Sequence, residues 1–290
     1  MAKASVALQP FTERRTRTME LRSRHLFARE ILDFYGSLLA VQERAHEEAS
    51  SARPTSDDLV AYIAEMVVPA VVDVTIAAGP LKLRDAVARR FEATDPREFV
   101  AAWIGGEEQG TVDRYLARAS LAPVLEALGP EAAASCIGVH DKRHCPTCGG
   151  PPQLSYFAIP GEDLAAGGRF LVCARCQNSW GYARMTCPGC GETSSSRLPI
   201  FSEEGTASGE RGSVVRGLEG KLGDRGAVAT TVFPHIRIEG CESCQSYLLN
   251  IDLAADPAAV PEVDELAALP LDLYARELGF TKIIPNLMGF

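Results

Sequence analysis

Cys145-Pro146-Thr147-Cys148-Gly149 and Cys187-Pro188-Gly189-Cys190-Gly191 are two copies of one short motif, CPxCG. A second motif, CxxCQ, follows each of them, at residues 173–177 and again at residues 241–245. Eight of the nine cysteines in this 290-residue chain therefore belong to Cys-x-x-Cys pairs. The alternating order predicts an internal duplication that forms two tandem rubredoxin-like or zinc-ribbon modules.

The spacing of these cysteines is typical of tetrahedral metal sites. Two intervening residues let one tight turn direct both sulfurs at a single ion about 2.3 Å away, and two such turns complete the tetrahedron. Proline fixes φ in the turn, and the glycine after the second cysteine takes the left-handed conformation. The motif order predicts pairing of the first turn with the second and of the third with the fourth, with interleaved pairing as the alternative. The predicted ligands are Cys145, Cys148, Cys173 and Cys176 in site 1, and Cys187, Cys190, Cys241 and Cys244 in site 2.

The chemistry of a four-thiolate site is limited. Four protein ligands saturate a tetrahedral ion, which argues against hydrolysis by a metal-bound water. Zinc in such a site would be structural, whereas iron would be able to exchange one electron. Thiolates accept both metals, so the spacing alone does not choose between them. Four basic residues near the motifs would offset the negative charge of the sites or simply lie at the surface: Lys142, Arg143, Arg175 and Arg184.

Charge argues against a nucleic-acid partner, although many ribbon modules have one. The formal net charge is −9 and the sequence pI is about 5.2, whereas nucleic-acid binding requires a basic face. Positive charge is concentrated between Lys3 and Arg29. We expect residues 1–20 to form a flexible, solvated tail rather than a contact arm.

Cysteine usage and the absence of targeting patterns indicate a cytoplasmic protein. Metal-type cysteine spacing with one unpaired residue, Cys136, fits a reducing compartment. Cys136 lies in an apolar stretch and is predicted to be a buried small side chain, with a reactive thiol as the alternative. Arg14-Arg15 is not followed by the apolar segment of an export signal. No apolar run is expected to reach membrane-spanning length.

The region before the first motif, residues 21–139, predicts an all-α helical bundle. Apolar residues recur at three- and four-residue steps between Leu26 and Leu39. The apolar segment 59–78 is expected to kink at Pro69. Asp95-Pro96-Arg97-Glu98 has the order of a helix start, with Asp95 as the cap. Further helices are expected at residues 81–91 and at residues 121–128, the latter ending at Gly129-Pro130.

The rest of the chain completes an α+β fold. Residues 140–251 form the predicted metal-ribbon domain, with a hairpin between strands at residues 154–159 and 169–173. The glycine-rich residues 202–231 predict a long mobile loop, followed by a strand at residues 232–238. Residues 252–290 form a C-terminal tail with a helix from residue 262 to residue 278.

No catalytic constellation accompanies these elements. There is no HExxH, no serine-histidine-acid pattern, and neither GxGxxG nor GxxxxGK[ST] for a nucleotide. His140 and His144 flank the first motif, but four thiolates already complete site 1, so they are not expected to be ligands. The sequence therefore predicts neither catalytic residues nor an organic cofactor.

The stretch Gly168-Arg169-Phe170-Leu171-Val172-Cys173, followed by Trp180, Arg184 and Cys187-Pro188, resembles the FdhE-type formate dehydrogenase accessory proteins. The ending Cys241-x-x-Cys244-x-x-Tyr247-Leu248 does so as well, and the resemblance extends over residues 143–285. The chain departs from that family where residues 202–231 lengthen the usual link and Gly181 replaces a common histidine. It departs again where Asn286-Leu287-Met288 replaces the usual Asn-Pro-Phe.

The resemblance implies a cytoplasmic assembly factor and not an enzyme. Such proteins support maturation of molybdenum-dependent formate dehydrogenases and are thought to contact the catalytic subunit before export. The rubredoxin-like cysteines of the family favour iron over zinc in both sites. The first alternative is a rubredoxin-like electron-transfer or redox-sensing protein, and the second is a ribbon-type nucleic-acid-binding protein.

Overall fold

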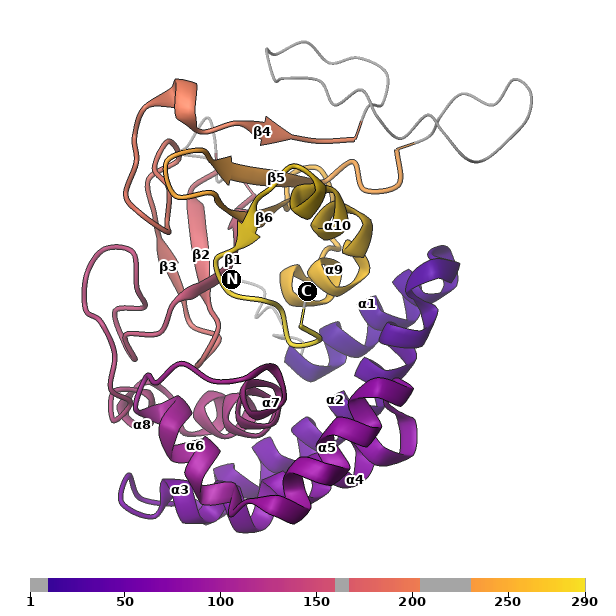
Figure 1. Cartoon of the computed structure of the whole chain (residues 1–290), viewed down its shortest axis with the longest axis vertical. Coiled ribbons are helices and arrows are strands. Elements are labelled where there is room, and N and C mark those ends of the chain that lie inside the picture. Colours follow the sequence, from indigo (N-terminus) through magenta and orange to yellow (C-terminus); the bar gives the residue numbers. More distant parts are fainter. Residues whose placement is uncertain (1–9, 160–166, 204–230, 290) are drawn as a thin grey trace, which may run out of the picture.

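The structure, a computed structural model, describes residues 10–159, 167–203 and 231–289. N-terminal helices form one side of the molecule, and a sheet with two C-terminal helices forms the other (Figure 1). This arrangement confirms the predicted α+β class, with helices first and the cysteine clusters after them. Most of the predicted loop at residues 202–231 lies outside the described residues.

The N-terminal helices pack around α2 and α7, and α4 contacts both. A short 3-10 helix (Leu26–Ala28) precedes α2, and a π-helical turn (Ile63–Val67) joins α3 to α4. The helices are α1 (Pro10–Arg24), α2 (Arg29–Ala52), α3 (Leu59–Tyr62), α4 (Val68–Ala78), α5 (Leu81–Ala93), α6 (Pro96–Ile104), α7 (Thr111–Leu128) and α8 (Pro130–Ala133).

Local helix signals are found where the sequence placed them. The Asp95 carboxylate accepts a hydrogen bond from the Arg97 backbone N–H at 2.9 Å, which confirms the predicted cap of α6. The π-helical turn ends at Val67, two residues before Pro69, because proline has no N–H and its ring clashes with the carbonyl four residues earlier. Helix α7 begins ten residues before the predicted start at residue 121, so that element was underestimated.

The run Leu59–Ala78 corrects the expectation about membrane-length segments. It is 20 residues long with a mean hydropathy of 1.9, enough by length and composition to cross a membrane. Core helices of soluble proteins pass the same test, and 44% of the apolar window is buried inside this molecule. Ile63, Val67 and Val71 belong to the helical core, so packing against α2 and α7 accounts for the apolar composition.

The predicted flexible tail is wrong for residues 10–20, which form most of α1. Arg17 is only 2% exposed, and its guanidinium donates to Asp264 at 2.5 and 2.9 Å and to Asp256 at 2.6 Å. Arg14 bonds Glu126 at 2.9 Å and Glu262. The basic character of this segment therefore reflects ion pairs with distant acids and not solvation.

One continuous sheet joins the two modules. The described strands follow the order β3-β2-β1-β6-β5-β4, and β7 pairs with β6. The β1–β2 hairpin is confirmed, whereas β5 begins at Ile236 instead of residue 232. A 3-10 turn (Ser195–Arg197) precedes β4. The strands are β1 (Pro152–Phe157), β2 (Arg169–Cys173), β3 (Ser179–Gly181), β4 (Ile200–Phe201), β5 (Ile236–Cys241), β6 (Ser246–Asp252) and β7 (Thr281–Lys282).

The junction between the modules is the parallel pair β1 and β6, in a sheet whose other strands in this order pair antiparallel. Ser155 faces Asn250 in the register, and the Asn250 amide donates to the Ser155 hydroxyl at 2.7 Å. Each module therefore contributes an inner strand to a shared sheet. The two modules are not separate units in series.

Two helices, α9 (Pro261–Ala267) and α10 (Leu269–Glu277), replace the single C-terminal helix that the sequence predicted. The break falls at Ala268, because Pro270 cannot continue the hydrogen-bond ladder of α9. Helix α9 packs on β1 and β6 and α10 packs on β5, and both share a core with α1 and α2. Large members of that core are Phe11, Leu32, Tyr247, Leu249 and Val263.

A buried ion cluster holds the C-terminal segment onto this core. The Lys282 ammonium lies 2.8 Å from the Glu265 carboxylate and 2.9 Å from that of Asp272. Both acids are fully buried, and the Tyr247 hydroxyl donates to Asp272 at 2.9 Å. Burial raises the pKa of Glu265, and the adjacent Lys282 charge opposes that rise.

Arg118 of α7 extends this cluster into the helical half. It hydrogen-bonds Gln153, which in turn donates to Glu265. It also donates to the carbonyl oxygens of Ala174 at 3.1 Å and Pro285 at 2.5 Å. Complete burial lowers the pKa of Arg118 to about 10, which still leaves it charged at neutral pH. One side chain thus connects a bundle helix, a cysteine turn and the C-terminal segment.

We expect Lys282→Met to lower the free energy of unfolding by about 3–5 kcal/mol, because it leaves two buried carboxylates without their cation. Urea unfolding of the metal-loaded protein measures the change. Lys82→Met, at an exposed position on α5, is the control and should change stability by less than about 0.5 kcal/mol. Equal effects of the two substitutions would contradict a stabilising role for the ion cluster.

Candidate metal centres

The four cysteine turns share one backbone conformation. The residue after the second cysteine has a positive φ in every turn: 65° at Gly149, 59° at Gln177, 83° at Gly191 and 53° at Gln245. This confirms the left-handed conformation predicted for the two glycines. Glutamine in the same conformation is unusual, and it makes the second and fourth turns equivalent to the first and third.

Backbone hydrogen bonds close these turns and point toward sulfur. The N–H groups of Gly149 and Gly191 donate at 2.9 Å to the carbonyl oxygens of the first cysteine in each CPxCG motif. The Arg175 N–H lies 3.3 Å from the Cys173 sulfur, and the Gly189 N–H lies 3.3 Å from the Cys187 sulfur. Such donors stabilise thiolates, so the turns are prepared to bind a cation.

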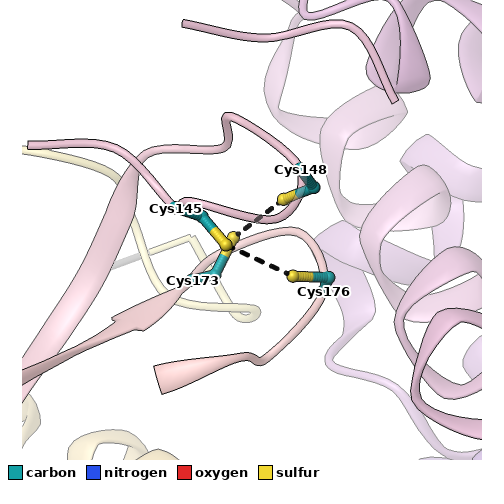
Figure 2. Close-up of side chains that lie close together, drawn as sticks. All are labelled: Cys145, Cys148, Cys173 and Cys176. Atoms are coloured by element: carbon teal, nitrogen blue, oxygen red, sulfur yellow. Dashed lines mark hydrogen bonds between the residues drawn. The ribbon is translucent and has the colours of Figure 1, made fainter. Parts of the chain in front are cut away.

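The first turn meets the second, and the third meets the fourth. Figure 2 shows the four sulfurs of site 1 converging, with separations of 3.7 Å for Cys145–Cys176 and 3.3 Å for Cys148–Cys173. In site 2 the corresponding distances are 3.7 Å for Cys187–Cys244 and 3.7 Å for Cys190–Cys241. All ligand atoms within each cluster lie within 4.8 Å of one another.

These distances fit the donor set of a tetrahedral metal ion. Four sulfurs about 2.3 Å from one ion stand about 3.8 Å apart. No disulfide links the cysteines, all of which are free thiols within the described residues. Burial raises the pKa of Cys173 and of Cys187, so ionised thiolates there require a compensating cation. Both clusters can hold a soft metal ion.

The two clusters differ in exposure. All four cysteines of site 1 are buried, and they belong to the same core cluster as helical residues such as Phe34 and Leu116. In site 2, Cys190 is exposed and Cys244 is half-buried. Site 1 is therefore enclosed between the helices and the sheet, whereas site 2 reaches the surface.

The basic residues near the motifs have specific roles in packing. The Arg175 guanidinium donates to the carbonyl oxygens of Ile137 at 3.0 Å and Cys148 at 2.9 Å, and it lies 5.6 Å over the Trp103 ring. Arg143 donates to the Gly189 carbonyl at 3.0 Å, which connects the first motif to the third. Both arginines thus support the turns that carry the cysteines.

Neither histidine beside the first motif joins site 1. His140 is exposed, and the His144 ring bonds the Asp141 carboxylate at 2.7 Å. Cys136 is 4% exposed, which confirms its predicted burial, and desolvation raises the pKa of its thiol to about 11. Cys136 belongs to neither cluster.

One further cluster has no local sequence signal, because its members are far apart in the chain. His235, Asp256 and Asp264 place their ligand atoms within 4.8 Å of one another. The Arg17 guanidinium already contacts both carboxylates, at 2.6 and 2.5 Å. The guanidinium pairs with both acids, so the cluster is a structural ion network that fixes α1 to α9.

Comparison with known proteins agrees with this arrangement. Residues 144–184 match the central domain of FdhE, and residues 224–288 match the C-terminal domain of FdhE. These matches support an FdhE-type protein. The two segments contain six of the eight clustered cysteines: all four of site 1 lie in the first segment, and Cys241 and Cys244 lie in the second. Cys187 and Cys190 lie between the two segments.

Two relatives, both named as FdhE homologues, show the extent of the similarity. One from Aquifex aeolicus is 33% identical over 149 residues, which cover 51% of this chain and 42% of the relative. One from Pseudomonas aeruginosa is 29% identical over 228 residues, which cover 74% of this chain and 65% of the relative. The chain therefore spans less than two thirds of either relative.

A solved structure shows that the fold as a whole is shared. The crystal structure of the FdhE protein from Pseudomonas aeruginosa superposes with a TM-score of 0.61 at 21% identity. The match covers 96% of this chain and 94% of that one. The helical half, which neither family segment includes, therefore belongs to the same fold.

The two glycines that follow the second cysteine of each CPxCG motif test the geometry of the turns. Gly149→Ala and Gly191→Ala both place a side chain at positive φ, which costs about 1–2 kcal/mol. At Gly149 the new Cβ would also lie 2.5 Å from the Gly138 backbone, whereas at Gly191 its nearest contact is an Arg143 side-chain atom at 4.0 Å. Urea unfolding should therefore show a clearly larger loss for Gly149→Ala, and equal losses would contradict the described packing of site 1.

The difference in exposure predicts the order of thiol modification. Iodoacetamide, applied to the folded protein and followed by mass spectrometry, should alkylate Cys190 first and Cys244 next. The buried thiols of site 1 and Cys136 should react only on unfolding. Modification of site 1 at the same rate as Cys190 would show that site 1 is not enclosed.

Proposed function

We propose that this FdhE-type protein is a cytoplasmic accessory protein for the maturation of a molybdenum-dependent formate dehydrogenase. It would bind the catalytic subunit through a scaffold that two four-cysteine metal sites hold in place. The observation that carries the proposal is the pair of FdhE domain matches around two converged cysteine clusters. In this role the protein is a binding partner and not an enzyme.

The cysteines would hold the metals, with Cys145, Cys148, Cys173 and Cys176 in site 1 and Cys187, Cys190, Cys241 and Cys244 in site 2. We favour iron over zinc because of the rubredoxin-like turns, and iron would supply one-electron exchange. Four thiolates leave no coordination position for a substrate. The contribution of the protein itself is to fix the relative positions of the helices and the sheet.

A rubredoxin-like electron-transfer or redox-sensing role is the second candidate, and the exposure of Cys190 favours it. Electron exchange requires a metal near the surface, and site 2 meets that condition while site 1 does not. A nucleic-acid-binding role has less support. In the basic N-terminal segment, the half-buried Arg14 and the buried Arg17 are paired with carboxylates and do not present a basic face.

Anaerobic co-purification of the tagged chain with the catalytic subunit tests the proposal. Wild-type protein should retain the subunit with two metal ions per chain. Cys145→Ser/Cys148→Ser should lose one ion and weaken retention by about tenfold or more, because site 1 joins the two halves. Metal analysis and quantitative mass spectrometry measure both quantities.

Cys136→Ser is the matched control, since this buried cysteine lies near site 1 but outside it, and it should retain both ions and the subunit. Recovery of an electron carrier in place of the catalytic subunit would favour the second candidate. Full metal content in the double variant would contradict the assignment of site 1.

A further inference from the structure

A cavity of about 380 Å³ lies beside site 2, and Cys187 of that site forms part of its wall. Arg237 and Glu239 line it from β5, where they alternate with Ile236 and Ile238, which pack into the core under α9 and α10. Because side chains alternate across a strand, the cavity lies on the opposite face of β5. Its size falls within the range of ligand pockets.

Three arginines concentrate positive charge in this cavity. The guanidinium groups of Arg184 and Arg237 lie 4.7 and 4.4 Å from the centroid of the same ring, that of Phe157. Arg169 is buried and pairs with Glu239 at 2.5 Å, and Arg237 contacts the same carboxylate at 3.0 Å. A single acid thus serves two of the arginines.

The charge balance of the cavity differs from that of the chain. Its described lining contains three arginines against two carboxylates, Glu239 and Asp252, in a protein with a formal net charge of −9. The Asp252 carboxylate accepts the Ala254 N–H at 2.9 Å. A net negative protein repels extended polyanions at long range, so a local arginine group favours a ligand with a small number of carboxylates.

Two buried donors in the lining lack an acceptor. Within the described residues, the Nε atoms of Arg169 and Arg237 have no hydrogen-bond partner. The Arg169 side chain is only 1% exposed. An unsatisfied buried donor costs about 1–3 kcal/mol, and an anionic ligand or an ordered water in the cavity would remove that cost.

The rest of the wall is largely apolar, which restricts the kind of anion that fits. A ligand must place an apolar group beside its negative charge. Ile200 belongs to β4, the last strand in the described sheet order, so a peptide leaving the cavity would follow a sheet edge. The apolar lining includes Met185, Pro188, Leu198, Pro199, Ile200 and Ile283.

We propose that this cavity binds an acidic, partly apolar peptide segment of the partner protein, with a carboxylate held by Arg184 and Arg237. Arginine pairs with carboxylates in a planar, two-bond geometry, which suits such a ligand. The identity of the partner rests on the proposed function, the formate dehydrogenase catalytic subunit. Cys187 and Pro188 form part of the wall, so a metal in site 2 would preorganise the cavity for binding.

Titration of the metal-loaded full chain with purified catalytic subunit tests this proposal. Arg184→Ala/Arg237→Ala should raise the dissociation constant by about tenfold or more. Arg89→Ala, at an exposed position on α5 outside the cavity, should change it by less than about twofold. Matching melting temperatures and metal contents establish that the variants are folded.

Hydrogen exchange of the wild-type complex provides a second measurement that needs no variant. Segments 184–188 and 237–240 should become protected on binding. Undiminished affinity of the double variant, or no protection in these segments, would overturn the cavity assignment and leave the proposed function standing. Failure of the wild-type chain to bind the subunit would overturn the proposed function and the identity of the peptide together.

Discussion

The enclosure of site 1 between the helices and the sheet is the constraint on which the rest of the structure depends. Its four cysteines lie in the same buried cluster as the helical core. Four thiols in contact cannot all ionise away from water without a cation. A bound metal would therefore neutralise the turns and fix the helical half against β1 and β2 at once, which a surface site could not do.

Buried polar contacts extend that constraint to both ends of the described chain. Arg118 connects α7 to the second cysteine turn and to the C-terminal segment. Lys282 of β7 pairs with two buried acids, Glu265 and Asp272. Arg17 fixes α1 to α9 through Asp264. Because each charge is paired, burial is compensated, and the loss of any one partner leaves a charge in the core.

Signals that act within a few residues were predictable from the sequence. The cysteine turns, the Asp95 cap and the effect of Pro69 all follow from local stereochemistry. Contacts between distant segments were not predictable from the sequence, since no local pattern marks them. The burial of Arg17 by an acid 247 residues away turned an expected solvated tail into a packed helix. Likewise, the alternation of motifs predicted two modules but not the parallel β1–β6 pair that joins them.

X-ray absorption spectroscopy at the metal edge of anaerobically purified protein tests the central claim most directly. The account predicts two metal ions per chain, each with four sulfur ligands at about 2.3 Å and no nitrogen or oxygen ligand. An absorption edge would also distinguish iron from zinc. A mixed sulfur and oxygen or nitrogen shell, or protein that is fully folded without metal, would contradict it.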